Sequence, residues 1–99
     1  MAYRPNPIDT SRVRLSPEIL ELAERLAENT HENWAKERFS AGWIYGDRRN
    51  DALKKHPCLV PYDQLPDSEK DLDRALATQT LKALIALGYN ITKGRVPRA

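Results

Sequence analysis

The sequence predicts a mainly α fold, in which a long N-terminal helix packs against one or two C-terminal helices. Apolar residues recur at helical spacing in two stretches, and helix start and stop signals mark the ends of both. Between them, residues 43–65 show no sustained helical period, so we expect a long structured loop with short extended segments. A chain of 99 residues suits one small domain with a thin core.

The first helix is expected to begin at Pro17 and to end near Ala41. Ser16 is a typical N-cap residue, Pro17 suits the first helical position, and Gly42 is a typical stop. Such a helix measures about 35–40 Å, which is long for so small a domain. Its second half must therefore protrude or pack against something other than its own short core. The apolar residues at helical spacing in its first half are Ile19, Leu22, Ala23 and Leu26.

The stripe that continues this apolar face becomes polar in the second half of the helix, at Asn33 and Glu37. One interpretation is that these two side chains hydrogen-bond the backbone of the following loop. The alternative is a polar cleft, of which the neighbouring flank of the helix would form one wall. That flank carries His31, Trp34 and Arg38.

The loop and the second helical region follow. Residues 43–45 are expected to form a short extended segment, and prolines stiffen the crossing from residue 56 to residue 62. The second helical region is expected to begin near Asp67 and to stop at Gly88. Its apolar residues fit two helical phases, which predicts two helices or a kink near Thr78.

Both ends of the chain are expected to lie outside helices. Residues 1–15 contain Pro5 and Pro7, which favour an extended arm. Residues 93–99 are basic and are expected to form a frayed tail. The side chains expected to pin the arm to the body are Tyr3, Ile8, Val13 and Leu15.

The composition excludes several functional classes. The net charge of +2 is too small to indicate a nucleic-acid partner. No apolar run approaches the roughly 18 residues that a membrane span requires, and the N-terminus lacks the layout of a signal peptide. A single cysteine, Cys58, excludes an internal disulfide and fits a reducing compartment. We expect a cytoplasmic protein with neither a membrane nor a nucleic acid as its partner.

No catalytic or metal-binding motif is present. His31, His56 and Cys58 lack the paired spacing of a zinc site. His56 is also poorly placed as a base for Cys58, because side chains two apart on an extended segment point to opposite faces. The sequence has no glycine-rich phosphate loop and no Gly-x-Ser-x-Gly elbow. We expect a protein that is not an enzyme and needs neither a metal nor a cofactor.

A small basic cluster follows the aromatic residues 43–45. Cationic side chains beside aromatic rings bind nucleotides by pairing with phosphate while a ring stacks on the base. A solvated loop is the simpler interpretation, and on these residues alone it is favoured. The cluster consists of Arg48, Arg49, Lys54 and Lys55.

Five blocks of sequence, in order, resemble a known family, the RyR domain. This domain is found in pairs in the cytoplasmic part of ryanodine receptors and singly in some bacterial proteins. The resemblance covers residues 3 to about 91, so we expect residues 1–99 to form a single RyR-type domain. The blocks are Tyr3–Ser11, Leu26–Ala35, Gly42–Gly46, His56–Tyr62 and Leu81–Tyr89.

The resemblance implies a compact, mostly helical domain with long antiparallel helices. Paired repeats in the receptors pack about a pseudo-twofold axis, so a lone repeat is expected to imitate them as a homodimer. The paired repeats also resemble a module whose tryptophans flank a cleft for an adenine nucleotide. The matching positions here are Trp34, Cys58 and Asp73. Asp73 departs from the receptor pattern, where an amide occupies the matching position in one repeat.

Two hypotheses of function follow. In the first, the chain is a ligand-binding module for an adenine nucleotide or a nucleotide-derived signal, with Trp34 stacking on the base and arginines meeting phosphate. In the second, it is a protein-interaction module without a small-molecule ligand, docking a partner or a second copy. The residues expected to contact a ligand are Trp34, His31, Arg38, Cys58, Asp73, Arg48 and Arg49.

Overall fold

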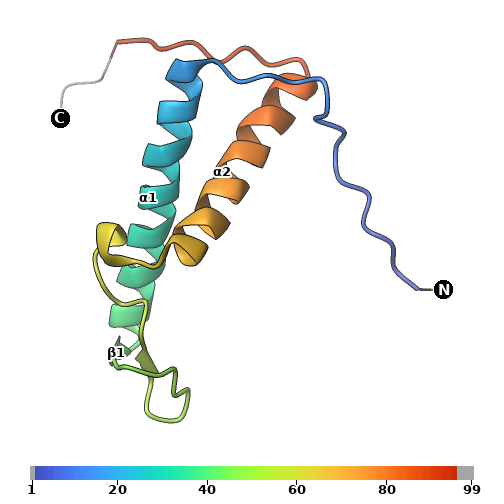
Figure 1. Cartoon of the computed structure of the whole chain (residues 1–99). Coiled ribbons are helices and arrows are strands. Elements are labelled where there is room, and N and C mark those ends of the chain that lie inside the picture. Colours follow the sequence, from blue (N-terminus) through green and yellow to red (C-terminus); the bar gives the residue numbers. More distant parts are fainter. Residues whose placement is uncertain (1, 96–99) are drawn as a thin grey trace.

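Two long helices packed side by side form the body of the molecule, as Figure 1 shows for the computed structural model, which describes residues 2–95. A long loop connects the lower ends of the two helices. The mainly α class predicted from the sequence is confirmed. The elements in order are α1 (Pro17–Ser40), β1 (Ile44–Tyr45), β2 (Lys55–His56), the 3₁₀ helix η1 (Tyr62–Gln64) and α2 (Asp67–Ala86).

Cap residues explain where the helices begin and end. The Ser16 hydroxyl accepts a hydrogen bond from the Ile19 N–H at 3.3 Å and so starts α1. Both helices end in a Schellman motif with glycine at a positive φ, +90° at Gly42 and +99° at Gly88. The N–H of the residue after each glycine donates to a carbonyl five positions back. The helix ends expected from the sequence are therefore confirmed.

α2 is one continuous helix, so the first of the two alternatives, a division into two helices near Thr78, is wrong. The second phase in its sequence arose from Leu72 and Leu76, which are exposed and do not face α1. The residues of α2 that pack against α1 are Ala77 and Leu81, and these share a single helical phase. These two exposed leucines therefore suggested a change of helical register that the helix does not contain.

The core is thin and consists of two clusters along α1. Ala23 and Ala27 are buried in them, and these small residues let the neighbouring elements approach α1 closely. Within residues 2–95 no large side chain is fully buried. The first cluster joins the two helices and the second lies under the loop. Their buried members are Ala23, Ala77 and Leu81 in the first, and Ala27, Tyr62 and Leu65 in the second.

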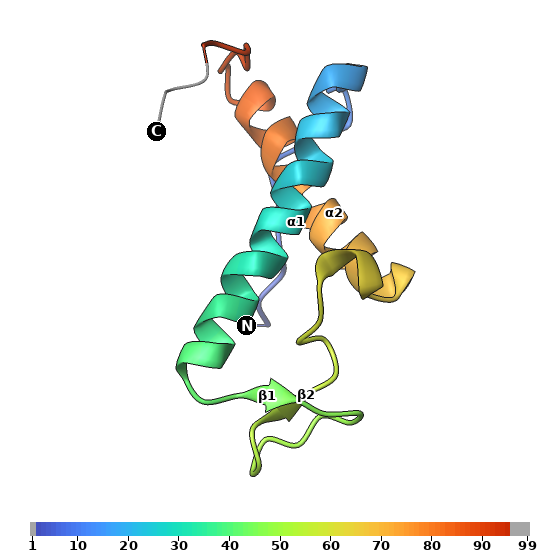
Figure 2. The same cartoon turned by 90° about the vertical axis from the view of Figure 1, so that its left-hand side faces the viewer.

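The second half of α1 turns a different flank inwards from the one its apolar stripe predicted. Asn33 and Glu37 are exposed, so the interpretation that they lie on a core-facing stripe and hold the loop is wrong. His31 is buried instead, while Trp34 and Arg38 are half-buried. The two helices cross at an angle (Figure 2), so the buried side of α1 winds around the helix axis. Residues of α1 that are four apart are displaced by about 40° per step around the axis, and such a row follows the buried side.

A charged network ties η1 to both helices. The Tyr62 hydroxyl donates to Glu24 at 3.1 Å. Arg74 donates to both carboxylate oxygens of Glu24, with its Nε at 2.7 Å and its Nη2 at 3.0 Å. The guanidinium lowers the pKa of Glu24, since it stabilises the ionised carboxylate. This network fixes the end of the loop at the junction of α1 and α2.

The loop holds a parallel pair of two-residue strands, in which Ile44 faces Lys55 and Tyr45 faces His56. The extended segment predicted at residues 43–45 is therefore present. Gly46 follows β1, and a Cβ atom at this position would lie 2.7 Å from the Cβ of Lys55. Only glycine allows the two strands to approach so closely, and this approach places His56 beside α1.

The ends of the chain form no helix or strand within residues 2–16 and 89–95. Leu15 packs against the first cluster, as expected, and Val13 is half-buried. Tyr3 and Ile8 are exposed, so the expectation that they pin the arm to the body is wrong. The predicted tail is exposed at residues 93–95, and its remainder, residues 96–99, lies outside the described residues. Neither of the two helices in the described chain has the length and apolarity needed to cross a membrane.

Candidate functional site

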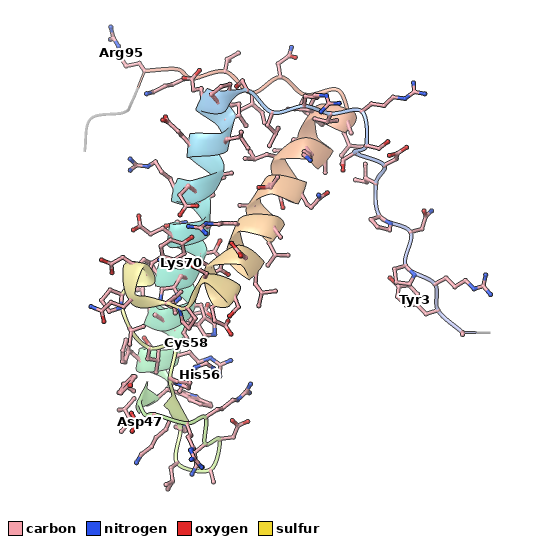
Figure 3. The ribbon with its side chains drawn as sticks, viewed as in Figure 1. Tyr3, Asp47, His56, Cys58, Lys70 and Arg95 are labelled. Atoms are coloured by element: carbon pink, nitrogen blue, oxygen red, sulfur yellow. The ribbon has the colours of Figure 1, made fainter. Side chains whose placement is uncertain are left out.

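A cavity of about 210 Å³ lies where the second half of α1, the loop and the first turns of α2 meet. Figure 3 labels His56 and Cys58 on the loop, and Lys70 marks the beginning of α2. The cavity combines aromatic rings, a thiol and two carboxylates. The residues that line it are His31, Trp34, His56, Cys58, Leu65, Glu69 and Asp73.

His31 is fixed from both sides. It is only 4% exposed, and its Nε2 donates to the carbonyl of Val60 at 2.7 Å, which places the ring hydrogen on Nε2. Its ring stacks on the Trp34 indole with centroids 5.6 Å apart. The imidazole therefore ties the loop to α1 and supports one side of the tryptophan.

Trp34 is the centre of an aromatic group at the edge of the cavity. The His56 ring meets the indole edge to face, with centroids 4.9 Å apart. The Arg38 guanidinium lies 5.6 Å from the Trp34 ring and 4.8 Å from the Trp43 ring. Arg38 thus forms cation–π contacts beside the cavity and is not among its lining residues. Trp43 is half-buried and serves this group rather than either core cluster.

His56 and Cys58 form a local turn that does not activate the thiol. The backbone N–H of Cys58 donates to Nδ1 of His56 at 3.0 Å. Burial lowers the pKa of His56, and the charges of Arg49 and Arg38 lower it further. Burial raises the pKa of the Cys58 thiol, and Glu69 and Asp73 add to this effect. Both shifts oppose the thiolate–imidazolium pair that a cysteine nucleophile requires.

Two carboxylates, Glu69 and Asp73, lie one helical turn apart on α2 and reach the cavity together. Burial raises the pKa of Asp73, and the charge of Glu69 raises it further, while His31 acts in the opposite direction. The pair makes the cavity a site for hydrogen-bond donors and an unfavourable place for an anion. Within residues 2–95, no His, Cys, Asp and Glu side chains gather in a group of three or more that could hold a metal ion.

The structure brings together only some of the residues that the sequence indicated. Trp34, His31, Cys58 and Asp73 all line the cavity, although they are up to 42 positions apart in the chain. The remaining members of that group are arginines that lie elsewhere. Arg38 lies beside the cavity, Arg48 is exposed in the loop, and Arg49 pairs with Asp51 at 2.8 Å.

Sequence reasoning did not assign a ligand-binding role to three of the lining residues: His56, Leu65 and Glu69. The spacing of Glu69 and Asp73, four apart on a predicted helix, was an available signal, because it places both carboxylates on one face. Leu65 and His56 lie in the irregular loop, where no periodicity indicates which way a side chain faces.

The family model of the RyR domain matches residues 3–93, which include the arm, both helices and the loop. The chain belongs to the RyR domain family. The resemblance seen in the five sequence blocks is therefore confirmed. Because the match contains every lining residue, the cavity lies entirely within the RyR domain. Membership is consistent with a ligand-binding module or an interaction module.

Proposed function

We propose that this RyR domain is a non-enzymatic binding module whose cavity accepts the base of an adenine nucleotide or of a nucleotide-derived signal. The observation that carries the proposal is the Trp34 indole at the edge of a cavity that also holds two carboxylates. Tryptophan offers a large π surface on which a base stacks, with roughly 1–3 kcal/mol per base. The cavity, at about 210 Å³, is smaller than the ~300–1,000 Å³ of typical small-molecule sites. It therefore suits one ring system, with the sugar and phosphates outside.

The carboxylates supply the polar side of the proposed recognition. The exocyclic amino group of adenine is a hydrogen-bond donor, and both Glu69 and Asp73 are acceptors when ionised. A carboxyl group that keeps its proton also donates to a ring nitrogen while its other oxygen accepts from the amino group. Burial raises the pKa of Asp73, so this second form is easier to reach on ligand binding than it is for an exposed carboxylate. Asp73 is therefore proposed to recognise the edge of the base through hydrogen bonds.

The same charges argue against a phosphate inside the cavity. Arg49 is paired with Asp51, and Arg38 is held between two indole rings. No lysine or arginine is among the lining residues of the cavity in the described chain. We therefore expect phosphates to add little, so that adenosine binds within about tenfold of ATP, a difference of roughly 1.4 kcal/mol.

Calorimetry and thermal shift with adenine, adenosine and the adenine mono-, tri- and cyclic nucleotides test this function. Saturable binding is expected, and Trp34→Ala should weaken it about 10- to 100-fold, as the loss of one stacking contact implies. Phe39→Ala is the matched control, because Phe39 is an exposed aromatic residue on the same helix outside the cavity. Absence of binding by every adenine compound to the folded wild-type chain would reject the proposal. Equal losses in both variants would reject the role of Trp34.

A further inference from the structure

The outer side of α2 carries an apolar stripe that covers nothing in the described chain. Leu72, Leu76 and Leu87 are 62%, 65% and 60% exposed. At about 100° per residue they fall within a sector of about 60°, which is centred about 130° from the side that packs on α1. We call this stripe of three leucines the outer face of α2. Single exposed leucines are ordinary, but three on one side of a helix favour its use as an interaction surface.

The N-terminal arm, residues 2–9, leaves the body beside this face. Its base is held by the Thr10 hydroxyl, which donates to Gln79 of α2 at 3.1 Å. Beyond this bond the arm runs away from the body on the side of α2 opposite to α1, and both views agree on this (Figures 1 and 2). Tyr3 and Ile8 are 86% and 48% exposed on it. The arm therefore carries apolar side chains away from its own domain.

The chemistry of the arm complements that of the face. Both carry large apolar side chains, and the arm adds the cation of Arg4. Of the nearby acidic residues on α2, the exposed Glu69 lies at the edge of the leucines, whereas Asp71 is already paired with Arg74 at 3.1 Å. Prolines at positions 5 and 7 restrict the arm before it binds, which lowers the entropy lost on docking. Eight extended residues reach about 26–29 Å, enough to lie along a neighbouring helix.

We propose that two copies of this chain form a symmetric dimer, in which the arm of each copy packs on the outer face of α2 of the other. Both complementary parts are present on one chain, and the arm extends away from the two helices of its own chain (Figure 1), so a second copy satisfies both at once. The dimer does not depend on the proposed ligand.

Sedimentation and light scattering of the full chain, over a range up to about 100 µM, test this dimer. The wild type is expected to be a dimer, and Leu76→Glu should weaken it at least tenfold, because it places a charge in the middle of the outer face. A chain with both Tyr3→Asp and Ile8→Asp should weaken it as much. Leu20→Glu is the matched control, since Leu20 is an exposed leucine on α1, away from this face.

Circular dichroism of each variant establishes that it is folded, and the substituted residues are exposed enough for this to be expected. A wild-type chain that stays monomeric over the whole range would overturn the proposal. So would a dimer that survives Leu76→Glu. A dimer that needs Leu76 but survives the two arm substitutions would overturn the arm exchange. Loss of the dimer in the folded Leu20→Glu control would overturn the assignment of the face.

Discussion

Gly46→Ala is expected to destabilise the loop through a steric clash alone. A methyl group at this position would lie 2.7 Å from the Cβ of Lys55, and 3.0 Å and 3.2 Å from its Cδ and Cγ. The Cβ of Lys55 is fixed to the backbone of β2, so rotation of the lysine side chain does not relieve the nearest contact. The backbones of β1 and β2 must move apart, and His56 moves with them.

The magnitude follows from this geometry. Overpacking that forces backbone shifts costs typically 1–3 kcal/mol. For a domain of 60–100 residues, 1 kcal/mol lowers Tm by roughly 4–8 °C. A central cost of about 2 kcal/mol therefore predicts a decrease in Tm of about 8–16 °C for Gly46→Ala.

Two other glycines separate the steric effect from the backbone effect. Gly88 has a φ of +99° and open space around a Cβ, so Gly88→Ala measures backbone strain alone, at about 1–2 kcal/mol. Gly94 has neither a positive φ nor any atom within 4 Å of a Cβ, so Gly94→Ala should leave Tm unchanged. The expected order of destabilisation is Gly46 at least equal to Gly88, and Gly88 well above Gly94.

Thermal unfolding followed by circular dichroism measures all three, and urea unfolding gives the free energies independently. The m-value should stay constant, because the surface exposed on unfolding does not change. A Gly46→Ala chain with the Tm of the Gly94→Ala chain would refute the reasoning, since the strands would then separate without cost. Equal losses in all three variants would show that chain entropy, and not the clash, sets the effect.

Two further predictions concern titrating groups. Because Arg74 lowers the pKa of Glu24, this pair stabilises the fold above the usual glutamate pKa, and the contribution is lost as pH falls through the lowered value. The Glu24 side chain is 46% exposed, so Glu24→Gln should lower the free energy of unfolding by at most about 1 kcal/mol at pH 7 and should not change it near pH 2. A loss of stability that is constant with pH would contradict this. Cys58 should react more slowly with iodoacetamide at neutral pH than a free thiol does, because burial and nearby carboxylates raise its pKa. Asp73→Asn should accelerate the reaction, because it removes one nearby negative charge, while Asp71→Asn should not, and equal rates would refute a local effect.

Local chemistry made much of the fold predictable. The ends of both helices depend on a few neighbouring residues, such as the hydroxyl of Ser16 and the positive φ of Gly42 and Gly88. Each of these acts within about six residues of its own position, so the sequence alone contains the whole interaction. The family resemblance was visible for the same reason, since it rests on short blocks of sequence.

The sequence by itself determined the helices, the loop between them and the candidate role of Trp34. Only the tertiary structure decided which flank of α1 faces the loop, because that depends on the crossing of two helices and not on the period of one. It buried His31, exposed Asn33, and brought Glu69 to the cavity from a distant part of the chain. It also left Leu76 on the outer side of α2, where its helical phase resembled that of a core residue. Whether a residue is buried depends on how several elements pack together, so the sequence of one element does not determine it.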